Sequence, residues 1–532
     1  MNKESSPSPR REEGATSHPR NAATRLLPAL GGLLAAVPFL LPSLTFSPAA
    51  LASLIGLIPL LLALQSARAL SSRRRSWWSG FRMGWSFGAV FFIASLWWLG
   101  HVTVPGMLAL CAYLALYPAV WAGCAALIRP QSTRASITSA LALAGLWCGL
   151  EWLRSSLLSG FPWNGIAVPL GSIPGLRDWA PLLGVTGTAF FPVAFQSLLV
   201  PLSHPRPQLL AALTLTAAAF LPLAFPHHPD NSLPPLRVAL LQPNVSMQDK
   251  MFGDDSIQQQ RYDDLIASSF AAINASSPDL IVWPESALPG RFHYAVNEKA
   301  FDSLLASGST LITGCDADSI EGAASGDWNP RNCVALLQGD SSQFLLHAKV
   351  QLVPFGEFIP FRRQLPFLEK MLGDLIPRDF VRGTVTAPFP ASGPIPAIIP
   401  LVCFEDSVGS HVRRFVRPEP QLIVNVTNDN WFHQSPAAHV HAINARWRCL
   451  ELRRPMIRSA NTGITCTIDT DGRISALTPF TNGVLDTSIA PTSGPPTPFT
   501  RFGNLFSAIA GALGLAAIIF LARRRLAPAA SP

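Results

Sequence analysis

Acidic residues are almost absent from the first part of this chain and common in the second. Of its 32 Asp and Glu residues, only Glu151 and Asp178 lie between positions 26 and 229, whereas 27 lie between Asp230 and Asp486. Charged residues make up 14% of the whole chain, against about 25% in ordinary soluble proteins. This distribution predicts a membrane part followed by a water-soluble part.

Eight apolar stretches are long enough to cross a bilayer, which takes about 17 to 25 residues. Arg residues follow the second, fourth and sixth stretches and flank both chain ends, whereas the other links hold almost none. The positive-inside rule then predicts eight transmembrane helices with both termini in the cytoplasm. A signal peptide cleaved at Ala50-Leu51-Ala52 is the alternative, but that cut would fall inside the second stretch and upset the alternation. The stretches are 26–43, 49–67, 83–100, 105–128, 136–153, 182–200, 208–225 and 505–522.

The formal net charge of +8 comes largely from Arg residues beside these apolar stretches. That placement indicates membrane topology, because a nucleic-acid-binding protein carries its basic residues on one face of a soluble fold. The eight Cys residues show no CxxC and no zinc-like spacing, so no metal site is expected. Cys315 and Cys333 could pair in an oxidising compartment, which the sequence leaves open.

Between the seventh and eighth stretches the sequence changes to short β-rich runs alternating with helical segments at 255–275 and 436–453. This alternation predicts an α/β domain on the outer side of the membrane, which in a bacterium is the periplasm. The β-rich runs are 237–241, 280–283, 310–313, 333–337, 344–347, 398–402, 422–426 and 465–468. The expected organisation is a cytoplasmic tail (1–25), a membrane domain with seven transmembrane helices (26–225), a linker (226–236), a catalytic domain (237–486), a linker (487–504), a C-terminal transmembrane helix (505–522) and a cytoplasmic tail (523–532).

Three of these strands end in side chains that can carry chemistry. Glu285 follows Trp283 and a Pro, and apolar neighbours raise the pKa of a carboxyl towards that of a useful base. Lys349 precedes an apolar stretch and can stabilise an oxyanion there. Cys403 ends an apolar strand before two acids, at a turn where a thiolate can act as nucleophile. Each of the three residues alone also has a non-catalytic interpretation, namely a surface carboxylate, a solvated lysine or an inert buried cysteine.

Together and in this order, these motifs resemble the nitrilase (carbon–nitrogen hydrolase) superfamily with its Glu-Lys-Cys triad. With membrane spans on both sides, the chain is similar to the apolipoprotein N-acyltransferase family. The resemblance implies an α-β-β-α sandwich beside a polytopic helical membrane domain. The motifs are Trp283-Pro284-Glu285, Lys349 with Leu352-Val353-Pro354-Phe355-Gly356-Glu357, and Cys403-Phe404-Glu405, with further matches at Glu151–Arg154, Gly160–Trp163, Asn428–Phe432 and His439–Gly463.

The resemblance implies a two-step acyl transfer at the bacterial inner membrane, without metal or cofactor. Glu285 takes the thiol proton of Cys403, and the thiolate attacks an ester of a phospholipid, with phosphatidylethanolamine as the expected donor. Lys349 stabilises the oxyanion, and a thioester forms on Cys403. The α-amino group of the N-terminal diacylglyceryl-cysteine of an apolipoprotein then attacks this thioester. The membrane and these two substrates are the expected partners.

The same resemblance implies supporting residues around the triad, namely Glu357, Phe404, Glu405 and Trp431. Glu357 can orient Lys349 through an ion pair. The residue after the nucleophile is Phe404, where many relatives have Tyr, so the ring is kept and the hydroxyl is lost. Family members often carry a Trp on a mobile loop where this chain has Met251, followed by Phe252. These two residues are therefore the expected lid.

Two other functions fit the triad. One is a membrane-tethered amidase that passes the acyl group to water, although a soluble substrate would not need eight spans. The other is a non-catalytic lipid-binding scaffold, which the intact triad argues against. His439 and His441 form a further pair, but residues two apart on a helix point about 200° apart and do not converge on a metal. We expect them to have a structural or capping role.

Overall fold

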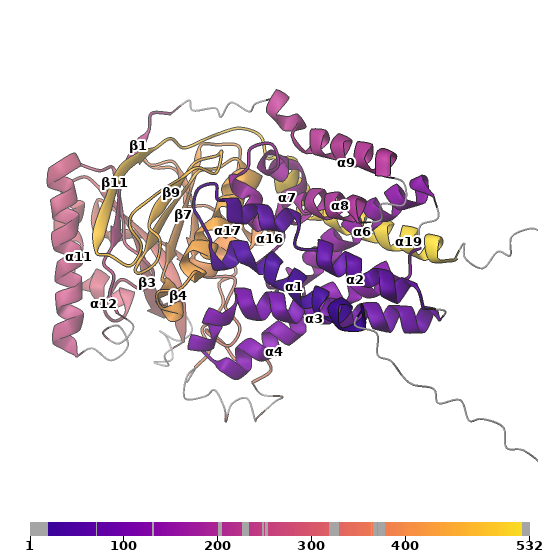
Figure 1. Ribbon diagram of the computed structural model, residues 1–532. Helices are drawn as coiled ribbons and strands as arrows, with labels where there is room; N and C mark the ends of the chain where they lie inside the picture. The colour runs from indigo at the N-terminus through magenta and orange to yellow at the C-terminus, as the bar shows by residue number, and fades with distance from the viewer. Residues whose placement is uncertain are drawn as a thin grey trace, which may run out of the picture.

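The computed structural model describes a helical part and an α/β part that pack against each other (Figure 1). The described residues are 20–70, 72–129, 132–200, 205–225, 233–246, 249, 254–318, 329–362, 364, 366, 370 and 378–523. The expected lid residues, Met251 and Phe252, lie outside them.

The helical part contains the first helices of the chain and its last one. Helix α19 comes from the far end of the sequence and packs along α6, where glycines let the two backbones approach. A Cβ on Gly145 would lie 2.4 Å from the carbonyl oxygen of Ala510, and one on Gly511 would lie 2.6 Å from the Cα of Gly149. The helices are α1 (Arg20–Leu40), α2 (Ile58–Arg68), α3 (Arg73–Ser95), α4 (Val104–Leu114), α5 (Leu116–Ala126), α6 (Thr133–Arg154), α7 (Ala180–Thr188), α8 (Phe190–Leu199), α9 (Pro205–Ala219) and α19 (Leu505–Arg523).

Among the described residues, four helical segments are long and apolar enough to cross a membrane: Pro48–Arg68, Val104–Ala126, Thr133–Arg154 and Leu505–Arg523. The pair Arg177–Thr188 and Phe190–Leu199, bent by 63°, makes a fifth if it forms one span. The protein is therefore a multi-pass membrane protein with four or five candidate spans. Helices α1, α3 and α9 occupy the other three expected stretches but do not meet the same length and hydropathy criteria. In α3 the last 18 residues exclude the three Arg residues at its start, but Arg82 and several Gly, Ser and Trp residues still lower the hydropathy.

The α/β part contains two mixed sheets, so the expected α/β domain is confirmed. The first has six strands in the order β11-β1-β2-β3-β4-β5, and the second has five in the order β10-β9-β8-β7-β6. Strands β1, β2 and β3 run parallel, as do β6, β7 and β8, and the remaining pairs are antiparallel. The strands are β1 (Leu236–Gln242), β2 (Leu280–Val282), β3 (Thr310–Asp318), β4 (Pro330–Gln338), β5 (Asp340–Ala348), β6 (Ala397–Val402), β7 (Gln421–Thr427), β8 (Met456–Ala460), β9 (Cys466–Ile468), β10 (Ile474–Ala476) and β11 (Gly483–Ile489).

The two sheets face each other across an apolar core that includes Val238, Val282, Ile398 and Val424. Helix α11 (Asp255–Ser276) covers the outer face of the six-stranded sheet, with α12 (Phe292–Asn297) and α13 (Asp302–Leu305) beside it. Helix α17 (Ala437–Leu452) and α16 (Gly409–Val412) cover the outer face of the five-stranded sheet. The segment expected as a linker at 487–504 contains the end of β11 and the short helix α18 (Pro498–Phe502).

Helix α17 lies between the five-stranded sheet and the helices of the membrane part (Figure 1). Every residue of α17 except His439 is buried. The indole N–H of Trp447 donates to the carbonyl oxygen of Val168 at 3.0 Å, and Glu451 Oε1 accepts the N–H of Val185 at 2.8 Å. The α/β part is therefore fixed to the membrane part by a shared helix that is buried except at His439.

Candidate active site

Glu285 follows β2 and is held in place from two sides. Its side chain is 8% exposed, and Oε1 accepts a hydrogen bond from Asn332 Nδ2 at 2.7 Å. Strand β3 passes so close that a Cβ on Gly314 would lie 2.5 Å from the Cα of Glu285. The preceding Trp283 is buried and donates its indole N–H to Ser269 Oγ at 2.9 Å. The strand end therefore presents one carboxylate in a fixed, largely water-excluded position.

Lys349 follows β5 and is paired with Glu357, the ion pair expected from the sequence. Lys349 Nζ lies 2.8 Å from Glu357 Oε1, and the lysine side chain is 1% exposed. Burial alone would lower the pKa of Lys349, but the charges of Glu357, Cys403 and Glu285 outweigh it and raise the pKa above its usual value. Asn332 Nδ2 also contacts Glu357 Oε1 at 3.3 Å, so one amide links the two carboxylates. The site therefore holds a permanent ammonium ion.

Cys403 is the first residue after β6 and begins the short helical turn η7 (Cys403–Ser407). Its φ of 52° is in the left-handed region, a strained conformation for a residue with a side chain. Burial raises the pKa of the Cys403 thiol, Glu285 and Asp429 raise it further, and Lys349 opposes them. The sulfur is therefore a thiol at rest, and a nearby base must remove its proton before it can attack a substrate.

Glu405 is a buried structural anion that connects the segment after Lys349 to the strand before Cys403. Its carboxylate accepts the N–H groups of Val350 at 2.7 Å, Gln351 at 2.9 Å and Val402 at 3.0 Å. Burial alone would raise the pKa of Glu405, but His411, His347 and the backbone N–H groups outweigh it and lower the pKa to about 2. Loss of this carboxylate would release both segments.

The other expected supporting residues lie where the membrane part meets the α/β part. The half-buried ring of Phe404 lies 6.3 Å from that of Trp163, in the loop after α6. Trp431 is 47% exposed, and the neighbouring Phe432 packs on Trp98 of the membrane part at 4.5 Å. Trp431 therefore lies at the surface of the protein beside this contact.

Sequence reasoning missed Asn332, which lies inside β4 and belongs to none of the motifs, so no local signal identified it. His441, for which we expect a structural or capping role, is 1% exposed, and its ring nitrogens contact Asp406 and Asp429. No group of three or more His, Cys, Asp or Glu side chains in the described ranges is arranged to hold a metal ion. Cys315 and Cys333 lie opposite each other on β3 and β4, and both are buried free thiols.

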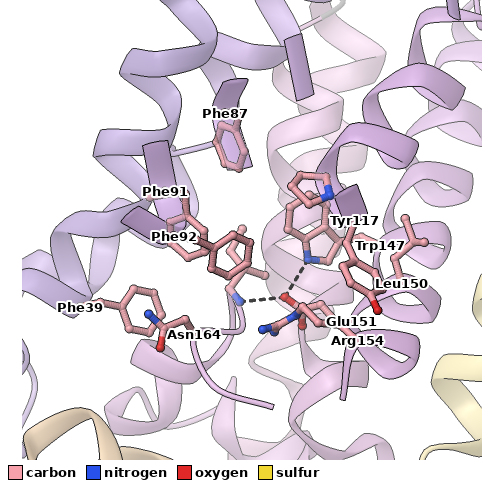
Figure 2. Close-up of a pocket in the computed structure, with 13 residues that line it drawn as sticks. Phe39, Phe87, Phe91, Phe92, Tyr117, Trp147, Leu150, Glu151, Arg154 and Asn164 are labelled. Atoms are coloured by element: carbon pink, nitrogen blue, oxygen red, sulfur yellow. Dashed lines mark hydrogen bonds between the residues drawn. The ribbon is translucent and has the colours of Figure 1, made fainter. Parts of the chain in front are cut away.

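A cavity in the membrane part lies next to the loop that follows α6. It is small, with about 40 Å³ open to the centre of a water-sized molecule, and it is partly open to the outside. Figure 2 shows the aromatic side chains that surround it, with Glu151 and Arg154 at one edge. Helices α1, α3, α5 and α6 contribute the lining, which includes Phe39, Phe87, Phe91, Phe92, Tyr117 and Trp147.

Both charged groups at the edge of this cavity are bonded to the protein. Glu151 Oε1 accepts the indole N–H of Trp147 and the backbone N–H of Ile166, both at 2.9 Å. Arg154 donates to the carbonyl oxygen of Trp163 at 2.5 Å. Trp163 in turn donates its indole N–H to Ser407 Oγ in η7 at 2.8 Å. One loop therefore contacts both the aromatic cavity and the turn that carries Cys403.

Two family models match separate parts of the chain. Residues 32–198 match the apolipoprotein N-acyltransferase N-terminal domain, and residues 237–494 match the carbon-nitrogen hydrolase domain. The first model covers most of the helical part, and the second covers the two sheets with all three strand-end residues.

Similar full-length proteins are known. An apolipoprotein N-acyltransferase from Geobacter metallireducens is 31% identical over 533 residues, which cover 93% of this chain and 95% of that protein. One from Bradyrhizobium diazoefficiens is 31% identical over 81% of this chain and 80% of its own length. Among solved structures, a carbon-nitrogen hydrolase from Helicobacter pylori aligns with 48% of this chain and 89% of its own, at 12% identity and a TM-score of 0.35.

We expect Glu405→Gln to destabilise the protein at pH 7. The pKa of this fully buried carboxyl falls from 4.5 to about 2 in the folded protein, which corresponds to about 3 kcal/mol. Because its pKa is lowered in the folded protein, the ionised carboxylate stabilises the fold at pH values above 4.5. This stabilisation is lost as the pH falls from about 4.5 towards 2. Thermal unfolding in detergent should show a lower midpoint temperature for the variant than for the wild type at pH 7. The difference between the two midpoints should become smaller below pH 4.5.

Asp264→Asn is the control, because Asp264 is an exposed carboxylate on α11 of the same domain. Its unfolding midpoint should equal that of the wild type at every pH. Equal midpoints of Glu405→Gln and the wild type at pH 7 would contradict this structural role of the Glu405 carboxylate. A difference between the midpoints that stays constant on acidification would contradict it as well.

Proposed function

The chain belongs to the apolipoprotein N-acyltransferase family, and we propose that Glu285, Lys349 and Cys403 perform its reaction. The observation that carries the proposal is the arrangement at the strand ends. A protonated, half-buried thiol lies within the electrostatic reach of one carboxylate and one ammonium group. A base, a nucleophile and an oxyanion-stabilising cation are the three groups that acyl transfer through a thioester requires.

In the first half-reaction the acyl group moves from the donor lipid to the enzyme. Glu285 accepts the thiol proton of Cys403, and the thiolate attacks an ester carbonyl carbon. Lys349 and a backbone N–H near Phe404 stabilise the oxyanion, and such a donor is typically worth about 3 to 4 kcal/mol. The bond between the carbonyl carbon and the glycerol oxygen then breaks. The leaving oxygen takes the proton from Glu285, which releases a lysophospholipid and leaves a thioester.

In the second half-reaction the neutral α-amino group of a diacylglyceryl-cysteine attacks the thioester carbon. Glu285 accepts a proton from the attacking nitrogen, and Lys349 again stabilises the oxyanion. The carbon–sulfur bond breaks, and the sulfur takes the proton from Glu285. The product is an N-acylated lipoprotein, and Cys403 returns to the thiol. Glu357 orients Lys349 throughout.

The membrane arrangement completes the proposal. The donor is a phospholipid of the outer leaflet of the inner membrane, with phosphatidylethanolamine as the first choice. Eight spans, with α1, α3 and α9 among them, leave both termini in the cytoplasm and the α/β domain (237–486) in the periplasm. The positions of the Arg residues support this orientation.

The aromatic cavity of Figure 2 supports a path for the donor acyl chain. Its lining is mostly apolar and includes six aromatic side chains, its charged groups are paired with the protein, and the adjoining loop contacts the turn of Cys403. Each CH₂ group taken up there is worth about 0.8 kcal/mol. We propose that this cavity receives the end of the chain as the ester reaches Cys403.

We expect Cys403→Ala to form no acyl adduct. Wild-type protein incubated with phosphatidylethanolamine should gain the mass of one fatty acyl chain in intact-mass spectrometry, because the thioester forms at this sulfur. The control Cys124→Ala, a half-buried cysteine of α5, should gain the same mass. An adduct on folded Cys403→Ala, or none on the wild type and the control, would contradict the proposal.

We expect Phe91→Ala to shift the donor preference towards longer acyl chains, because it enlarges the cavity. The ratio of thioester-formation rates for a longer and a shorter donor should rise by up to about fourfold per added CH₂. Ile93→Ala is the control on the same helix, since Ile93 is 41% exposed and outside the cavity lining. Equal ratios in both variants would exclude this cavity from chain binding.

A further inference from the structure

A groove in the membrane part lies on the opposite face of α6 from the aromatic cavity. Residues of α6, α7, α8 and α19 line it, with α18 at one end, and it leaves about 880 Å³ open to the centre of a water-sized molecule. Figure 1 shows α19, in yellow, beside α6. We call this hollow the apolar groove. In α6, Thr138, Leu141, Ala142 and Gly145 line the groove, and Trp147, Leu150, Glu151 and Arg154 line the aromatic cavity.

The apolar groove has the character and the length of a site for a lipid chain. Among the described residues that line it, only Thr138 and Trp179 carry polar side-chain atoms. The indole N–H of Trp179 is bonded to the carbonyl oxygen of Ala219 at 3.1 Å. The lining residues of α19 run from Leu505 to Ala517, which is about 18 Å along a helix axis. One leaflet contributes half of a hydrocarbon core of about 30 Å. The groove therefore fits an acyl chain that lies along α19.

An arginine of the α/β part lies at the α18 end of the groove. Arg413 begins the short turn η8 (Arg413–Phe415). Its Nη1 donates to the carbonyl oxygens of Thr500 at 2.9 Å and Arg501 at 3.3 Å in α18. Gly503 lines the groove, and a Cβ there would lie 2.9 Å from Arg413 Nε. That buried Nε has no hydrogen-bond partner among the described residues. Arg413 therefore places an unused donor beside the groove.

Two more arginines adjoin Arg413 and leave this end of the groove positively charged. Arg414 follows it in η8, and Arg501 precedes Phe502, which lines the groove; Arg414 and Arg501 are both exposed. No carboxylate in the described part of the chain forms an ion pair with any of these three arginines. Burial and the charge of Arg414 lower the pKa of Arg413, as they do for a cation that lacks a nearby anion.

We propose that the apolar groove binds a phospholipid with a net negative head group, whose acyl chain lies along α19 and whose phosphate pairs with Arg413, Arg414 and Arg501. A zwitterionic head group would bring its own ammonium ion among these cations, whereas an anionic head group does not. The bound lipid joins η8 of the α/β part to the C-terminal helix. It is separate from the proposed acyl donor, because no described residue lines both the groove and the aromatic cavity.

The test compares ether-linked phosphatidylglycerol with ether-linked phosphatidylethanolamine, neither of which carries an ester for Cys403 to attack. Native mass spectrometry of the full-length protein in detergent gives the apparent Kd of the first bound lipid. The wild type should bind phosphatidylglycerol more tightly than phosphatidylethanolamine. Arg501→Gln should weaken phosphatidylglycerol binding about fivefold, the contribution of one arginine beside an anionic lipid, and weaken phosphatidylethanolamine binding less. Lys299→Gln, which removes an exposed cation of the α/β part outside the groove, should bind both lipids as the wild type does.

Leu513→Trp tests the apolar part of the site. Leu513 lines the groove and is 66% exposed, so the larger side chain takes up space along α19. Both lipids should bind more weakly, by about fourfold for each CH₂ group that the ring displaces. Leu210→Trp on α9 is the matched control, since Leu210 is 65% exposed and outside the groove lining. This control should bind both lipids as the wild type does.

Equal binding of the two lipids by the wild type would overturn the anionic-lipid site, and this comparison needs no substitution. Equal phosphatidylglycerol binding by Arg501→Gln and Lys299→Gln, or by Leu513→Trp and Leu210→Trp, would overturn it as well. A protein dimer that only Leu513→Trp dissociates would assign the groove to a second copy of the chain instead. Lipid binding here needs no reaction at Cys403, so failure of the proposed function is seen separately, as a wild type that forms no thioester with ester lipids.

Discussion

The burial of helix α17 between the five-stranded sheet and the membrane helices determines how this protein is built. One side of the helix packs Ala438, Ala442 and Ala445 against the sheet, and the other packs Val440 and Trp447 among the membrane helices. Small residues on the first side let the helix lie close to the strands that end at Cys403. The α/β part is therefore not a domain tethered to a membrane anchor by a linker, since one helix belongs to the cores of both parts. Lipid substrates that stay in the bilayer require such a fixed site.

Three glutamates of the site illustrate how surroundings assign different tasks to the same side chain. Glu405 is surrounded by backbone N–H groups and serves structure. Glu357 is paired with Lys349 and holds that ammonium group in place. Glu285 accepts a hydrogen bond from Asn332 and raises the pKa of the Cys403 thiol, and we propose it as the base.

Much of this organisation could be predicted from the sequence, because apolar runs that end in polar residues indicate strands with polar side chains at their ends. All eight predicted β-rich runs coincide with strands, and the helix expected at 436–453 is α17. Strands β8, β10 and β11 were missed. In β8 the pattern is interrupted by Arg458, whose charge is paired with aspartates distant in sequence. Asn332 was missed for the same reason, since its partners come from other strands. The roles of Glu285, Lys349 and Cys403, the lid residues and the eight-span topology stay predictions.

A chase of the acyl-enzyme tests the central claim most directly. Wild-type protein is first loaded from phosphatidylethanolamine with an isotopically labelled acyl chain, separated from free lipid, and then mixed with a synthetic diacylglyceryl-cysteine lipopeptide. The account predicts that intact-mass spectrometry will show the label leaving Cys403 and appearing on the α-amino group of the lipopeptide at the same rate. Release of the label as free fatty acid, with an unmodified lipopeptide, would contradict it.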